Sequence, residues 1–378
     1  MVKLDIASVL YRVRSARFPA SDVGRRTLDA SIVLLFALAA VAAPQSDSRL
    51  EKIHAQFVFA DSHAHPSQFH RANVDRIEPQ ELDRYRRGLM DMVVCSVSSD
   101  AAYQGGYTNR DGTTVKRLQA PDDYPLKPGD AFAFTLDRFL RILKTTEDGS
   151  VVLALNPGQV LNAKKAAKLA LMAALEGADG LEGKVENLRQ LYAKGLRLCQ
   201  LVHFRANDLG FVQTRPYKAG GLLPFGETVV RECNRLGIII DLSHANTQTI
   251  MDAVRISRDP VIFSHTGAKA LQEGDRNITD EEIRAISSKG GLIGIWPSSS
   301  FPTIADMVRH IDHVKQLVGL DHVGIGSDLR GMSYTKEFGE EANFRAIAEG
   351  LIAAGYSDAE IGKVMGGNFF KLWQQIAK

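Results

Sequence analysis

The chain has 378 residues, of which 45% are hydrophobic and 24% charged, and this composition excludes a disordered or collagen-like protein. Lys and Arg number 46 against 44 Asp and Glu, so the charge gives no electrostatic reason to expect nucleic acid as a partner. The three cysteines, Cys95, Cys199 and Cys233, form no CxxC pair, which excludes a cysteine-based zinc site and a disulfide framework.

Residues 1–42 are predicted to be a signal or targeting segment. An uncharged run from Ala30 to Ala43 follows Arg25 and Arg26, which is the layout of a signal peptide. The run is shorter than the roughly 20 residues that span a bilayer. We therefore expect an exported, periplasmic or extracytoplasmic protein, or a membrane-anchored one if the leader is uncleaved. A buried core helix, or a start placed too far upstream, is the alternative.

Residues 43–378 are predicted to form one domain, because short apolar runs alternate with segments of helical period, as in parallel β/α units. We predict eight strands, at Phe57–Ala60, Met92–Ser96, Leu169–Leu175, Leu196–Val202, Gly237–Leu242, Val261–Ser264, Leu292–Trp296 and Val323–Ser327. Helices are predicted at Val185–Lys194, Glu227–Leu236, Thr247–Ile256, Asp280–Ser288 and Ile304–Val318. Eight repeats predict an α/β fold, a (β/α)8 TIM-like barrel with loop insertions.

Two segments depart from this alternation. Residues 101–128 are rich in Gly, Asp, Tyr and Pro and lack periodicity, so we expect a long loop over the mouth of the barrel. Residues 151–155 are a short apolar run outside the eight repeats, and we expect an additional edge strand there.

Polar side chains follow the carboxyl ends of the predicted strands, and in a β/α barrel that rim forms the active site. They come from six different strands: His63 and His65 follow the first, Glu176 the third, His203 the fourth, His244 the fifth, His265 the sixth and Asp328 the eighth. We therefore expect these seven side chains to converge.

Three histidine motifs favour metal binding. In DSHAH (Asp61–His65) the two imidazoles stand at i and i+2, which points both the same way on an extended segment. Alone this spacing is usually incidental, but here it follows a predicted strand. DLSH and FSH each place a Ser-His pair at a strand end, where Ser243 and Ser264 can orient the backbone or the ring. His244 and His265 are therefore predicted metal ligands.

Two carboxylates complete the predicted site. Glu176 follows an apolar run and precedes a glycine, so it can face the centre of the rim and bridge two cations. Glu182 is a rival that we place on a solvated turn. Asp328, within GIGSDLRG, can accept a proton from water and pass it to a leaving group. Its alternative role is a cap of the following helix.

Several blocks, in order, resemble the membrane dipeptidase family (renal dipeptidase, peptidase M19) of the amidohydrolase group. The resemblance runs from about Phe57 to Trp373. It is densest in LRLCQLVHFRAND, LLPFGETVVRECNRLGIIIDLSHAN, PVIFSHTGAKAL, RNITDEEI, HIDHVKQLVGLDHVGIGSD and GGNFFKLW. Members of this family are β/α barrels with two zinc ions, so the resemblance implies two divalent ions, most plausibly zinc.

The resemblance also implies a role for each matching residue. The metal ligands are His63 and His65 for the first ion, Glu176 as the bridge, and His244 and His265 for the second ion. His203 binds the substrate and its tetrahedral intermediate, Arg276 clamps the terminal carboxylate of the substrate, and Asp328 is the catalytic acid and base.

Three departures from the family pattern concern the pocket. His65 stands where the family usually has an aspartate, which removes one negative charge. Residues 177–180 read GADG instead of a Gly-Gly-His-Ser type run. Arg330 replaces the usual aspartate two residues after Asp328, and we expect it to place a cation near the amino end of the substrate.

Together these features predict a binuclear-metal hydrolase that cleaves the amide bond of dipeptides by attack of a metal-bridging hydroxide. One alternative keeps the metal centre but acts on another small amide, an N-acyl amino acid or a lactone. Another is a metal-binding barrel without catalysis. The expected partner is a small-molecule substrate and not nucleic acid. A homodimer, and membrane association through the N-terminal segment, stay open.

Overall fold

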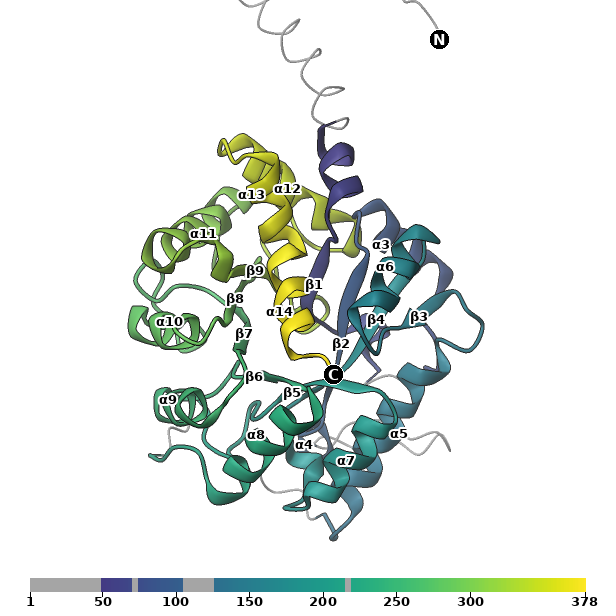
Figure 1. Cartoon of the computed structure of the whole chain (residues 1–378), viewed down its shortest axis with the longest axis vertical. Helices are drawn as coiled ribbons and strands as arrows, with labels where there is room; N and C mark the ends of the chain where they lie inside the picture. Colours follow the sequence, from purple (N-terminus) through teal and green to yellow (C-terminus); the bar gives the residue numbers. More distant parts are fainter. Residues whose placement is uncertain (1–48, 70–73, 105–125, 215–218) are drawn as a thin grey trace, which may run out of the picture. The chain divides into compact units, whose positions relative to one another are not determined.

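A computed structural model describes residues 49–69, 74–104, 126–214 and 219–378 (Figure 1). The predicted leader, residues 1–42, lies outside the described residues. So does most of the predicted 101–128 loop. Of that loop, residues Ala101–Gln104 form the short helix α4, and residues 126–128 lead into helix α5.

Eight parallel strands form the predicted barrel, with helices around it (Figure 1). In spatial order the strands are β1 (Ala60–Ala64), β2 (Met92–Ser98), β4 (Leu169–Glu176), β5 (Leu196–Gln200), β6 (Ile239–Asp241), β7 (Val261–Thr266), β8 (Leu292–Ile295) and β9 (Val323–Ile325). A parallel bridge between Ala64 and Leu329 joins the end of β1 to the segment after β9. The predicted additional strand is β3 (Val151–Leu153), which pairs with β4 outside this order.

The first strand begins and ends later than predicted. We expected Phe57–Ala60, whereas β1 runs over Ala60–Ala64 and is buried throughout. Asp61 and Ser62 satisfy their hydrogen bonds inside the barrel. Asp61 accepts from the N–H of Ser327 (2.8 Å), and the Ser62 hydroxyl donates to carbonyl groups of β7 and β9 (3.0 and 2.9 Å). Hydropathy alone cannot identify a buried polar strand of this kind.

The five predicted helices are confirmed, and others join them. Besides α4, the described helices include α3 (Pro79–Arg87), α5 (Asp130–Lys144), α6 (Pro157–Lys165), α7 (Val185–Ala193), α8 (Pro224–Leu236), α9 (Thr247–Ile256), α10 (Asp280–Ser287), α11 (Ile304–Val318), α12 (Phe344–Ala353), α13 (Asp358–Gly362) and α14 (Asn368–Ile376). Capping boxes begin α10, with Thr279 and Glu282, and α11, with Thr303 and Asp306. Gly237 ends α8 in the left-handed conformation (φ 77°).

Helix α14 covers the amino-terminal end of the barrel. Its side chains Phe369, Leu372 and Trp373 are buried in one apolar cluster with residues that begin the strands, including Met92 and Leu292. The helix lies over the centre of the barrel in Figure 1. Because this end is filled by apolar side chains, polar chemistry is confined to the opposite, carboxyl-terminal end.

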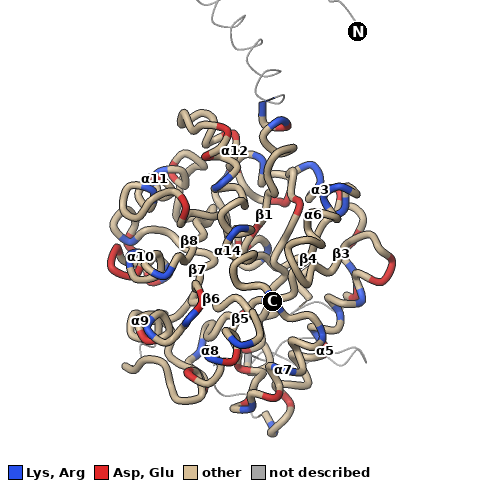
Figure 2. Tube along the Cα trace, viewed as in Figure 1, with Lys and Arg blue, Asp and Glu red and all other residues tan. Residues whose placement is uncertain are grey.

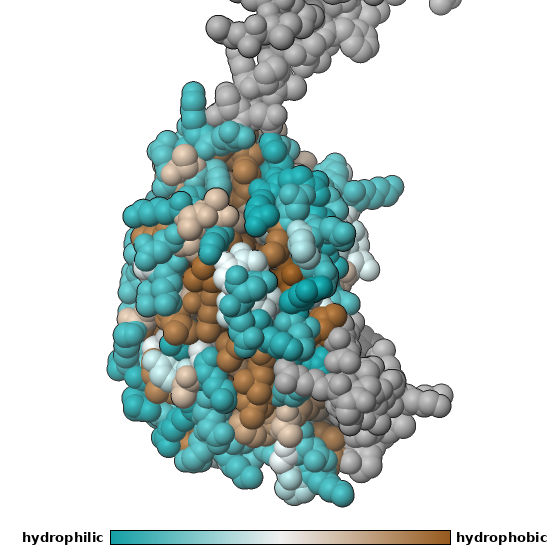
Figure 3. All heavy atoms as spheres, turned by 90° about the vertical axis from the view of Figure 1, so that its right-hand side faces the viewer, coloured by the Kyte–Doolittle hydropathy of each residue, from teal (hydrophilic) through white to brown (hydrophobic). Residues whose placement is uncertain are grey.

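The surface carries mixed charges. Lys and Arg alternate with Asp and Glu along the outer helices in Figure 2. The face in Figure 3 is mostly hydrophilic, with a narrow apolar strip. Among the residues that the structure describes, no helix combines the length and the apolar character that crossing a membrane requires.

Glycines permit the close contact of three neighbouring strands. A Cβ atom on Gly294 of β8, or on Gly326 just after β9, would lie 1.8 Å from the carbonyl oxygen of Ser264 in β7. That oxygen also accepts the hydroxyl proton of Ser62. Any side chain at either glycine would therefore push apart the strands that carry the polar rim.

Replacing Gly294 by alanine tests this packing. We expect Gly294→Ala to lower the free energy of unfolding by about 3 kcal/mol or more, because the clash is with main chain. The control is Gly339→Ala, since a Cβ atom there has no neighbour within 4 Å. Urea unfolding followed by circular dichroism measures both variants, and equal free energies for the two would contradict the packing argument.

Candidate active site

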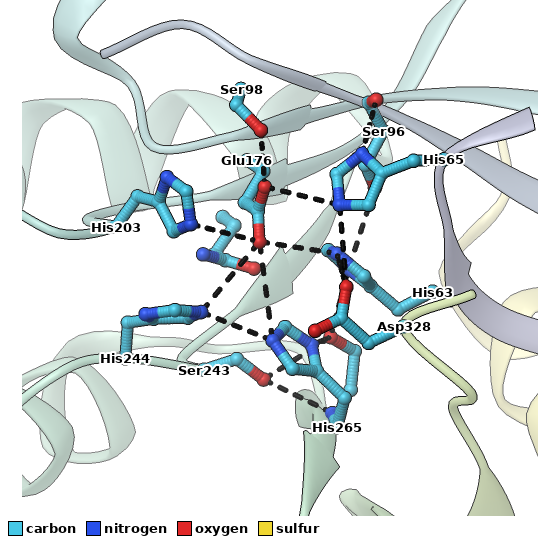
Figure 4. A network of polar contacts seen from close by, with 12 residues as sticks. His63, His65, Ser96, Ser98, Glu176, His203, Ser243, His244, His265 and Asp328 are labelled. Carbon is cyan, nitrogen blue, oxygen red and sulfur yellow. Dashed lines mark hydrogen bonds and ion pairs between the residues drawn. The ribbon is translucent and has the colours of Figure 1, made fainter. Parts of the chain in front are cut away.

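The seven side chains predicted at the strand ends converge in one hollow at the carboxyl-terminal end of the barrel (Figure 4). His63 lies in β1, Glu176 ends β4 and His265 lies in β7. The others follow strand ends: His65, His203, His244 and Asp328. The hollow opens into a cavity of about 330 Å³, which Arg276 and Trp296 also line.

The carboxylate of Glu176 is the centre of the arrangement (Figure 4). Its two oxygens lie near the Nε2 atoms of five imidazoles: His63 (3.2 Å), His65 (3.3 Å), His203 (3.2 Å), His244 (3.6 Å) and His265 (4.0 Å). The hydroxyl of Ser98 donates to Oε2 (2.5 Å). Glu176 itself is 2% exposed, so these groups replace its hydration.

The side chains form two groups that share Glu176. In the first group, the ligand atoms of His63, His65, Glu176 and Asp328 lie within 4.8 Å of one another. In the second group, Glu176, His244 and His265 meet the same limit, and the two Nε2 atoms of the histidines are 3.1 Å apart. Each group offers the imidazole nitrogens and carboxylate oxygens that zinc and similar divalent ions bind.

Charge in the hollow favours a cation. Burial would raise the pKa of Glu176, but His203, His65 and His63 outweigh it and hold the pKa well below its usual value. Burial lowers the pKa of His63, yet Glu176 and Asp328 more than compensate and raise it to about 9. Positive charge is therefore stabilised beside the two carboxylates.

The second pair of histidines differs. Burial, followed by Arg276 for His244 and by His63 for His265, holds the pKa of each imidazole well below its usual value. Both rings are therefore neutral at pH 7, and the neutral form is the one that binds a metal.

Several buried atoms in the hollow lack hydrogen bonds among the described residues, and two of them belong to the first group. The Nε2 atom of His63 lies 3.2 Å from Glu176 but outside hydrogen-bond geometry, and Oδ1 of Asp328 also has no hydrogen bond. Native proteins rarely leave such atoms unsatisfied without a ligand, water or ion. These atoms and the donor set fit a divalent metal site.

His65, which replaces the aspartate usual in the family, is oriented as a ligand. Its Nδ1 atom lies 3.1 Å from the carbonyl oxygen of Ser96, which can only accept. Nδ1 therefore carries the proton, and the Nε2 lone pair faces Glu176 and Asp328 at 3.3 Å from each. The substitution removes a charge but keeps a donor atom.

His203 has a buried partner that the sequence did not reveal. Its Nδ1 atom lies 2.8 Å from Oδ1 of Asp100, which is fully buried. Burial lowers the pKa of His203, but Asp100 and Glu176 raise it above the usual value. The Asp100 carboxylate thus keeps a proton on Nδ1 and directs Nε2 into the hollow. Phe204, 49% exposed, packs beside the ring (4.0 Å between centroids).

Asp328 does not cap a helix. The residues after it form a turn, and the next helical element begins at Glu341. Asp328 has φ 50° and His244 has φ 69°, so two of the seven residues hold left-handed backbone. For non-glycine residues this conformation costs about 1–3 kcal/mol and is concentrated at functional sites.

Arg276 reaches the cavity, and its two Nη atoms are available for a substrate. Neither Nη atom has a hydrogen bond among the described residues, and the group lies over the ring of Trp296 (5.2 Å to the centroid). Burial lowers the pKa of Arg276 to about 10, so it is still charged at pH 7. A fork of free N–H groups fits a carboxylate.

The expectation for Arg330 is wrong. Its side chain pairs with Glu341 (2.6 Å) and lies 3.5 Å from Glu81, and it does not line the cavity. Two buried carboxylates attract the guanidinium away from the rim, and a lone residue substitution could not show this. Glu182 is on a turn as predicted, but half-buried, where it accepts the N–H groups of Gly129 and Ala131 (2.8 and 3.0 Å) before α5.

Comparison with known proteins places the chain in a family. Residues 47–378 match the model of the membrane dipeptidases, peptidase family M19. An uncharacterized protein of Klebsiella pneumoniae is 29% identical over 269 residues, which are 66% of this chain and 99% of that protein. A dipeptidase of Claviceps purpurea is 31% identical over 252 residues, 64% of this chain and 59% of the fungal protein.

A solved structure shares the fold. The probable dipeptidase PvdM from Pseudomonas aeruginosa superposes with a TM-score of 0.74 at 22% identity, over 88% of this chain and 99% of that one. The family model covers most of the sequence, including every residue of the hollow. The chain therefore belongs to the membrane dipeptidase family, peptidase family M19, which confirms the predicted enzyme class, a metal-dependent dipeptidase.

Proposed function

We propose that the hollow holds two divalent ions, most plausibly zinc, and cleaves dipeptides. The single observation that carries this proposal is Glu176, whose carboxylate lies within 4.0 Å of five imidazole Nε2 atoms. His63 and His65 would bind the first ion and His244 and His265 the second, with Glu176 as the bridge. The chemistry that such ions supply when bound is the activation of water and the polarisation of a carbonyl group.

The side chains around the metal ligands divide the remaining work. Arg276 binds the terminal carboxylate of the substrate through its free N–H groups, which selects a short peptide end. His203, held by Asp100, donates a hydrogen bond to the oxyanion from Nε2 when the ring is doubly protonated, the form that Asp100 and Glu176 favour. Asp328 accepts the proton of the attacking water and returns it to the leaving amine, for which its unsatisfied Oδ1 is suited.

The alternative substrates lose part of their basis. The alternative of N-acyl amino acids or lactones rests on two departures from the family pattern, His65 and the cation that Arg330 would place beside the amino end of the substrate. The pairing of Arg330 with Glu341 turns that cation away, and Arg330 does not line the cavity. Free dipeptides therefore stay the favoured class.

We further propose export, with residues 1–42 as the leader, on the basis of their sequence pattern alone. Two further possibilities within this proposal are that the uncleaved segment anchors the protein to the membrane and that the protein forms a homodimer. Fractionation of the expressing cells and size-exclusion chromatography decide between these forms. Full-length protein confined to the cytoplasm would contradict export.

Metal analysis tests the role of Glu176. We expect the wild-type protein to contain two ions per chain and to lose dipeptide hydrolysis when treated with a chelator. Glu176→Gln should reduce the metal content and lower kcat/KM by at least about 100-fold, since one charge leaves both groups. Glu182→Gln, a carboxylate outside the hollow, is the control and should keep both ions. Activity that is indifferent to chelation would contradict the mechanism.

A substrate pair tests the role of Arg276. We expect Arg276→Met to lower kcat/KM for a dipeptide about 10- to 100-fold, the value of lost charged hydrogen bonds. The same variant should scarcely affect a dipeptide amide, because that substrate lacks the carboxylate. Equal losses on the two substrates would show that Arg276 has another role.

A further inference from the structure

The hydroxyl of Ser264 lies within hydrogen-bond distance of one histidine from each of the two groups. Ser264 lies in β7, is fully buried, and its Oγ atom is 2.8 Å from Nδ1 of His265 and 3.3 Å from Nδ1 of His63. The same oxygen is 2.5 Å from Oδ2 of Asp241. One serine thus contacts one imidazole from each proposed metal group, on the side of the ring away from Glu176.

The number of protons fixes the direction of these hydrogen bonds. A serine hydroxyl has one proton, and the shortest of the contacts is with the Asp241 carboxylate. The other carboxylate oxygen of Asp241 already accepts the N–H groups of Ser243 and Ser264, at 3.0 Å each. Asp241 is therefore an acceptor throughout, and Ser264 donates to it.

The imidazoles must then donate to Ser264. The Ser264 oxygen has no second proton to offer, so Nδ1 of His265 must carry the proton of that hydrogen bond. For the same reason Nδ1 of His63 carries the proton of its own hydrogen bond to Ser264. The His63 contact is the longer one, and the hydroxyl of Ser96 lies 3.4 Å from the same nitrogen. With Nδ1 holding a proton, the neutral form of each ring has its lone pair on Nε2, the atom that faces the hollow.

The neighbouring side chains support this arrangement. Ser243 Oγ is 3.1 Å from Ser264 Oγ and accepts the main-chain N–H of His265 (3.2 Å), so it holds the same ligand from another side. His63, Asp241 and His265 also lie close enough to one another to resemble a third metal group. The Ser264 hydroxyl already links these three side chains by hydrogen bonds, so they need no ion between them.

We propose that Asp241 and Ser264 form one positioning pair that fixes the ring orientation and the tautomer of a ligand in each metal group. The inference rests on the proposed function, because it assumes that both groups bind an ion through Nε2. Its consequence is that the two sites are coupled, so that a change in this one pair alters the affinity for both ions. If each histidine were oriented by a separate partner, a substitution of one partner would alter the affinity for one ion only.

Competition with a chelator, followed by metal analysis, measures the affinity of the full chain for each zinc ion in three variants. Ser264→Ala removes the shared hydroxyl. Asp241→Asn keeps the shape but turns an acceptor into a donor, so that Ser264 must send its proton to a histidine. Ser62→Ala is the matched control, since Ser62 is as buried and, among the described residues, its hydroxyl bonds to the carbonyl groups of Ser264 and Ile325 and to no histidine.

We expect Ser264→Ala and Asp241→Asn to weaken the binding of both ions about 10- to 100-fold, the usual effect of losing a hydrogen-bond partner of a metal-binding histidine. Ser62→Ala should leave both affinities unchanged. Thermal unfolding of the metal-free variants separates this effect from loss of folding. Weakening of one ion alone, or of neither, in folded protein would overturn the inference. Wild-type protein that binds fewer than two ions would overturn the proposed function itself.

Discussion

The buried carboxylate of Glu176 is the interaction on which the arrangement of the hollow depends. A carboxylate without water is stable only where opposite charge or donors surround it, and here five imidazoles and the Ser98 hydroxyl do so. These groups come from different strands, so no local segment could build the site. Closing the barrel and assembling the hollow are therefore the same event.

The scaffold holds this charge in place by close packing as well as by hydrogen bonds. Gly294 and Gly326 let neighbouring strands approach the carbonyl group of Ser264, whose hydroxyl contacts His63 and His265. The two glycines that set the strand spacing therefore pack against Ser264, the same residue that contacts the two rings. In such a site, small changes in packing reach the reacting groups directly.

Periodicity and position predicted most of the fold. Most of the strands are apolar runs that the barrel buries, and the rim residues could be identified because they follow those runs. Residues whose role depends on distant partners were not found. Asp100 is one, since only the fold brings it to His203. Arg330 is another, because its direction depends on Glu341 and Glu81.

The first strand shows the physical limit most clearly. Hydropathy ended it at Ala60, but the chain continues as a strand through Asp61 and Ser62, whose hydrogen bonds are made to other strands. A polar residue looks like a strand end until its partners are known. Metal-binding patterns such as DSHAH are visible in a sequence, whereas the serines and aspartates that orient the ligands look like ordinary polar residues.

Helix α14 has a consequence for how the barrel folds. Trp373, five residues from the end of the chain, is fully buried in the same cluster as Val58 and Ala60. The amino-terminal end of the barrel is therefore closed only when α14 packs against the start of β1, a segment from the opposite end of the described fold. A contact between segments so far apart in the sequence forms slowly, because closing so long a loop costs conformational entropy before the contact is made.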